Sequence, residues 1–81
     1  MRKILFIWDS KNKAADINLK NKLKITLGVI SKDNWEMVSN AALMVDARDA
    51  GKVERVFKEF GVNVEWKKFE VEIASFKRVI A

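Results

Sequence analysis

The sequence predicts a small α+β domain, in which a mostly antiparallel sheet of about four to six strands carries one or two helices on one face. Residues 4–8 form an unbroken apolar run of strand length, and residues 49–60 carry an apolar stripe at helical spacing. Residues 62–66 and residues 69–73 each alternate between apolar and polar side chains, as half-buried strands do. The 81 residues are enough for one domain, which we assign to residues 1–81.

The first expected element is a strand at residues 4–8, Ile-Leu-Phe-Ile-Trp, in which every side chain is apolar. Because both faces of such a strand avoid water, it belongs in the middle of a sheet, covered on both sides or paired across a subunit interface. The polar residues 9–13 then indicate a loop, and residues 14–21 fit either a short helix or an irregular segment.

Residues 22–30 predict a second strand, because Leu, Ile, Leu and Val alternate there with more polar residues. The same alternation extends backwards and places Lys20, Lys22 and Lys24 on one polar face. In a strand these lysines would stand about 6.6–6.8 Å apart.

Residues 35–47 have two interpretations that the sequence leaves open. As a helix, Asp33 would cap the first turn and Glu36 would complete a capping box. As strands, residues 35–39 and 42–47 would pair on either side of a Ser-Asn turn.

A helix over residues 49–60 is the clearest prediction in the chain. Gly61 is placed to end it, Asp46 or Asp49 can begin it, and Glu54 with Lys58 forms an i,i+4 ion pair. Its apolar stripe consists of Val53, Val56, Phe57 and Phe60.

The C-terminal part of the chain predicts a hairpin of two strands, residues 62–66 and 69–73, with Lys67 and Lys68 in the turn. A last apolar patch follows, for which the pattern indicates no secondary structure: Phe76, Val79 and Ile80.

Composition excludes several functional classes. The chain has no His and no Cys, so it lacks the ligands and nucleophiles of zinc sites, Ser-His-Asp triads and Cys-His dyads. Its three glycines are scattered and form no phosphate-binding loop. We therefore expect no enzyme, no metal site and no cofactor. No apolar run is long enough to cross a membrane or to resemble a secretion signal, so we expect a cytoplasmic protein without a membrane partner.

The net charge of +5 is unevenly distributed, which is the main functional indication. Residues 1–32 carry eight Lys or Arg against two acidic residues, whereas residues 33–81 carry eight bases and nine acids. A localised positive field attracts polyanions. The candidate nucleic-acid-binding residues are Lys11, Asn12, Lys13, Lys20, Asn21, Lys22, Lys24 and Trp35.

Trp35 is included because it follows a polar turn, which favours an exposed ring on which a base could stack. Trp8 and Trp66 lie in phase with apolar neighbours, so the core is the better interpretation for both. The lysines also have simpler explanations, since an exposed strand rich in lysine resists aggregation and an acidic protein could bind it as well.

These observations predict a small non-enzymatic accessory protein that binds DNA or RNA through a lysine-rich face at residues 11–24. The alternative is a regulatory protein-interaction module that acts through an apolar sheet edge or face, including as a homodimer.

Overall fold

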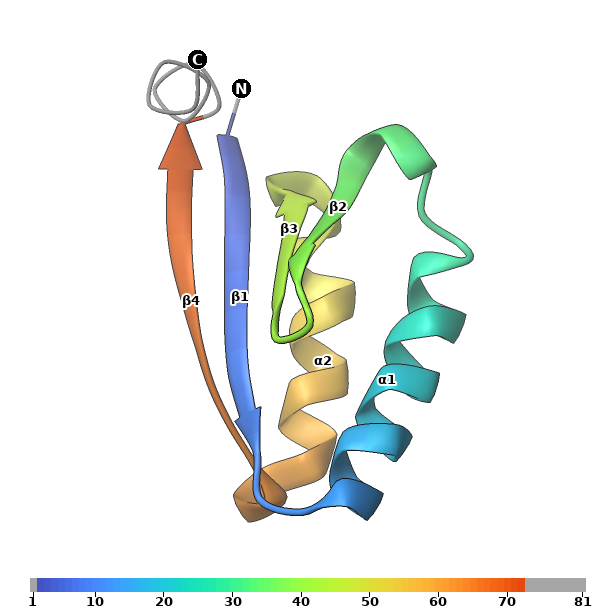
Figure 1. Ribbon diagram of the computed structural model, residues 1–81. Coiled ribbons are helices and arrows are strands. Elements are labelled where there is room, and N and C mark those ends of the chain that lie inside the picture. The colour runs from blue at the N-terminus through green and yellow to red at the C-terminus, as the bar shows by residue number, and fades with distance from the viewer. Residues whose placement is uncertain (1, 73–81) are drawn as a thin grey trace.

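The computed structural model describes residues 2–72, which form one antiparallel sheet and two α-helices (Figure 1). The α+β class predicted from the sequence is confirmed, and the described strands number four, in the spatial order β2-β3-β1-β4. The connectivity β-α-β-β-α-β is that of a split βαβ fold. The elements are β1 (Arg2–Ser10), α1 (Lys13–Leu27), β2 (Trp35–Ser39), β3 (Ala42–Asp46), α2 (Ala50–Phe60) and β4 (Val64–Glu72).

The central position of β1 follows from its apolar sequence and confirms the prediction. It pairs with β3 on one side and with β4 along its whole length on the other. The helices pack side by side on one face of the sheet, where Phe6 and Trp8 are buried (Figure 1). The alternate residues Leu5 and Ile7 lie on the other face, which no helix within residues 2–72 covers.

Four aromatic rings form the centre of the core and join α2 to the two longest strands. The Phe57 ring lies 5.4 Å from Phe6, 5.3 Å from Trp8 and 5.5 Å from Trp66, measured between ring centroids. Phe57 is fully buried, so each of these contacts excludes water. Such aromatic pairs contribute about 0.5–1.5 kcal/mol beyond the area they bury.

The strand predicted at residues 22–30 is wrong, because this stretch is the second half of α1 and the turn after it. The leucines at 19, 23 and 27 continue the four-residue spacing set by Ala15, and all four residues are buried. Ile25, which a strand would have buried, is 74% exposed. A run with apolar residues at every second position contains an i,i+4 series, so the pattern alone did not distinguish the two structures.

The start of α1 also explains why residues 14–21 are helical. Asn12 is the N-cap, and its side-chain oxygen accepts a hydrogen bond from the backbone N–H of Ala15 at 2.8 Å. Lys, Leu and Ala, which favour helices, fill much of the segment that follows.

Residues 35–47 adopt the strand interpretation, as β2 and β3, and the helix interpretation is wrong. All five residues of β3 are buried, and Leu43 and Val45 enter the core. Burial on both faces suits a strand between two neighbours better than a helix with one apolar side. The register between β2 and β3 shifts between Met37 and Ser39, just before the turn.

The helix predicted at residues 49–60 is confirmed as α2, with the Glu54–Lys58 ion pair at 3.2 Å. Gly61 ends it with φ of 53°, a left-handed value that glycine adopts without steric cost.

The predicted C-terminal hairpin is wrong, because β4 is one continuous strand. Lys67 and Lys68 pair with Ile7 and Phe6 of β1 instead of turning, since the nine-residue β1 offers a partner along the whole of β4. Residue 73 of the predicted second strand and the apolar patch at Phe76, Val79 and Ile80 lie outside the described residues.

Because Phe57 contacts three other rings, we expect Phe57→Ala to lower the free energy of unfolding by about 3–5 kcal/mol. Urea denaturation followed by tryptophan fluorescence measures this loss. The exposed helical control Ile25→Ala should change stability by less than about 0.5 kcal/mol. Equal losses in both variants would contradict this description of the core.

Candidate nucleic-acid interface

The lysines of α1 are distributed around the helix rather than along one strand face. Successive helical residues are about 100° apart, so Lys13, Lys20 and Lys24 fall within about 40° of one another. Lys22 lies on the opposite flank. We call Lys11, Lys13, Lys20 and Lys24 the basic flank, and its three helical members span about 16 Å along the axis.

Most of the basic flank has no counter-charge from the part of the chain that the structure describes. Within residues 2–72, Lys11, Lys13 and Lys24 form no ion pair, and all three side chains are exposed. Lys20 pairs with Asp16 at 3.2 Å, an exposed i,i+4 contact worth less than about 1 kcal/mol. Because Asp16 is the only acidic residue of α1, the flank keeps a net positive charge.

Lys22 and Asn21 are separated from the basic flank by the helical geometry. The Lys22 ammonium pairs with Glu59 of α2 at 3.0 Å. Lys22 and Asn21 both line an open hollow of about 460 Å³ between α1 and α2. The predicted place of Lys22 on one face with Lys20 and Lys24 depended on the strand, so it does not hold in the helix.

Asn12 and Trp35 have structural contacts that the sequence did not predict. The Asn12 oxygen caps α1, so it accepts from a backbone N–H of the protein. Trp35 is half-buried against the core and is not the freely exposed ring that the sequence favoured. The core positions expected for Trp8 and Trp66 are confirmed: Trp8 is a buried core residue, and half-buried Trp66 packs against the core.

A polar hollow of about 420 Å³ adjoins the basic flank where β1, the start of α1 and the β2–β3 turn meet. The Ser10 hydroxyl there donates to Asp16 at 3.3 Å, and Asn40 and Ala41 of the turn form the far side. Lys13 and Lys20 contribute its cations, while Asp9 and Asp16 contribute its carboxylates. The sequence could not reveal this hollow, because its parts are brought together only by the tertiary fold.

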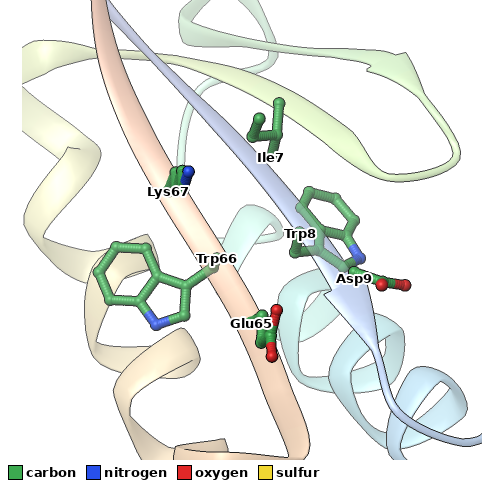
Figure 2. A pocket seen from close by; sticks show the side chains of 6 residues that line it. All are labelled: Ile7, Trp8, Asp9, Glu65, Trp66 and Lys67. Carbon is green, nitrogen blue, oxygen red and sulfur yellow. The ribbon is translucent and has the colours of Figure 1, made fainter.

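A third hollow, of about 280 Å³, lies where the last residues of β1 meet the first residues of β4 (Figure 2). Asp9 and Glu65 are opposite one another in the register of the two strands, which is unfavourable for like charges. Within residues 2–72 no group of three or more His, Cys, Asp or Glu could hold a metal ion.

Two carboxyl groups have lowered pKa values. The backbone N–H of Arg48 donates to Asp46 at 3.0 Å and holds the pKa of that carboxyl below its ordinary value. Hydrogen bonds from Lys68, and then from Lys58, lower the pKa of Glu54. Because Lys68 belongs to β4, Glu54 joins α2 to the edge of the sheet.

Comparison with known proteins assigns no family: no family model, curated protein or solved structure matches the chain. Neither helix in residues 2–72 is long and apolar enough to cross a membrane. The class defined by fold and surface is therefore a small α+β domain with a basic helix flank.

The lowered pKa of Glu54 makes part of the stability dependent on pH. A folded pKa below the ordinary 4.5 means that the stabilisation is complete above about pH 4.5 and is lost as the pH falls through the folded value. We expect Glu54→Gln to be less stable than the wild type at neutral pH, and the difference to shrink toward about pH 3.

Urea midpoints at both pH values measure this effect. The matched control Glu36→Gln changes an exposed residue that forms no ion pair within residues 2–72, so it should leave both midpoints nearly unchanged. A Glu54→Gln difference that stays the same at low pH would contradict the assignment.

Proposed function

We propose that this protein binds DNA or RNA as a polyanion through the basic flank of α1, without a chemical step. One observation carries the proposal: Lys13, Lys20 and Lys24 recur after seven and four residues, so the helix gathers them on one exposed flank. Lys11 lies one residue before the N-cap Asn12 and adds a fourth positive charge near the start of the helix.

Electrostatic attraction supplies most of the affinity in this proposal. Duplex DNA carries one negative charge per about 1.7 Å of axis, so a flank about 16 Å long faces several phosphates. The helix dipole adds positive potential near Lys11 and Lys13, because the N-terminus of α1 lies between them.

The flank is suited to binding without sequence selection. Lysine ammonium groups contact phosphates as point charges, whereas bidentate recognition of guanine is most often made by arginine. The flank contains no arginine. If its four lysines each contact one phosphate, log K should fall with log salt with a slope of about −3 to −4.

The burial of the leucines fixes the orientation of the flank. Leu19, Leu23 and Leu27 attach one side of α1 to the core, so Lys13 and Lys24 are held on an outward side. A polyanion therefore meets a positive stripe that is already aligned before binding.

We expect Lys13→Glu/Lys24→Glu to weaken binding at least tenfold at low salt and to reduce the salt slope by about 2. Fluorescence anisotropy with labelled single- and double-stranded DNA and RNA measures both quantities. The control Lys52→Glu/Arg55→Glu makes the same change in net charge on α2; because it also removes the Lys52–Asp49 ion pair at 3.6 Å, its folding is checked by urea denaturation.

Binding by the control variant should stay within about threefold of the wild type, because only the local positive field differs. Equal weakening in both variants would show that net charge, not the basic flank, determines binding. No binding by the wild type at low salt would contradict the proposal outright.

A further inference from the structure

The strand β4 forms an edge of the sheet, with one of its two sides unpaired in the described structure. Its inner side pairs with all of β1, from Arg2↔Glu72 to Ser10↔Val64. Its outer side carries backbone N–H and C=O groups that no strand within residues 2–72 contacts. At nine residues, β4 is also the longer of the two edges, since β2 has five. Long edges of this kind are templates for a further strand.

Two charged side chains on the helix-covered face of β4 form ion pairs, whereas those on its other face form none within residues 2–72. On the helix side, Lys68 pairs with Glu54 and Glu70 pairs with Arg2. On the opposite side, Glu65 and Lys67 are exposed, and neither forms an ion pair within residues 2–72. Figure 2 shows these two side chains on β4, next to Ile7 and Asp9 of β1.

We propose that β4 pairs antiparallel with β4 of a second copy of this chain, about a two-fold axis at Trp66. In that register Glu65 of each copy lies opposite Lys67 of the other. The dimer therefore contains two Glu65–Lys67 pairs of opposite charge. Directly opposite residues in an antiparallel pair point to the same face and interact at short range. The two four-stranded sheets then form one continuous sheet across the dimer.

Neighbouring two-fold registers are less favourable. An axis at Lys67 or at Lys68 places like charges opposite one another, which is destabilising. An axis at Phe69 places Lys68 opposite Glu70, but both already have partners within their own chain. The charge pattern therefore selects one register and opposes its neighbours, which is how specific pairing is usually achieved.

Exposed apolar side chains at this edge favour the same arrangement. Val62 is 79% exposed just before β4, and Phe69 is 48% exposed within it. With the axis at Trp66, the paired stretch is Val64–Lys68 of both copies, and Phe69 of one copy reaches Asn63, the neighbour of Val62, in the turn before β4 of the other. Pairing the strands thus removes apolar surface from water as well as satisfying backbone groups.

The test is sedimentation velocity of the full chain from about 5 to 200 µM. The wild type should form a dimer in this range. Lys67→Glu leaves only acidic side chains at the four facing positions and should raise the dimer dissociation constant at least tenfold. Arg55→Glu, an equal charge change on α2 away from β4, should leave it unchanged.

The double variant Glu65→Lys/Lys67→Glu tests the register, because it reverses both charges and restores the opposite pairs. It should recover the wild-type dimer. A monomer at every concentration would overturn the proposal, as would a dimer whose dissociation constant is unchanged in Lys67→Glu or is not recovered in the double variant.

A second measurement reads the register directly. The chain has no cysteine, so Glu65→Cys and Lys67→Cys can each be introduced alone. A mixture of the two should form a disulfide faster than either variant by itself. Equal rates would overturn the assigned register even if a dimer is present.

Discussion

The packing of the Phe57 ring is the interaction on which the other features of this structure depend. It stacks on Phe6 of β1 and on Trp66 of β4, and it contacts Trp8 as well. One side chain therefore fixes α2 over the two longest strands. A hydrogen bond from Lys68 to Glu54 connects α2 and β4 as well, in addition to the stacking of Phe57 on Trp66.

The position of α1 follows from that of α2. The two helices pack side by side, and the buried series from Ala15 to Leu27 faces the core. Because Lys22 lies on the side of Glu59 in α2, Lys13, Lys20 and Lys24 are left on the other flank. The buried residues Ala15, Leu19, Leu23 and Leu27, together with the aromatic cluster around Phe57, fix the orientation of α1. That orientation determines where the proposed binding surface lies.

The parts of the fold that the sequence predicted were those with one dominant pattern. β1 was predicted from its apolar run and α2 from its stripe and Gly61. The first half of α1 was left open between a helix and an irregular segment. The second half was predicted as a strand because its apolar residues fit periods of two and four equally well, and only tertiary burial distinguishes Leu23 from Ile25. β4 was divided wrongly because Lys67 and Lys68 resemble a turn, whereas pairing with β1 keeps them extended.

The candidate site was predicted in composition but not in geometry. The excess of lysine in residues 11–24 is visible in the sequence. The helix, however, places Lys22 on the opposite side from Lys13, Lys20 and Lys24. The cap formed by Asn12 and the partial burial of Trp35 depend on contacts that no local pattern specifies. The hollow beside Asn40 likewise required the β2–β3 turn to meet the end of β1.

The most direct test of this account is an NMR titration of the isotope-labelled protein with a short DNA duplex at low salt, following each backbone amide. If the basic flank is the binding surface, the largest shifts will fall on Lys11, Lys13, Lys20 and Lys24, while Lys52 and Arg55 of α2 stay nearly unchanged. Shifts concentrated on α2, or none at all, would contradict the account.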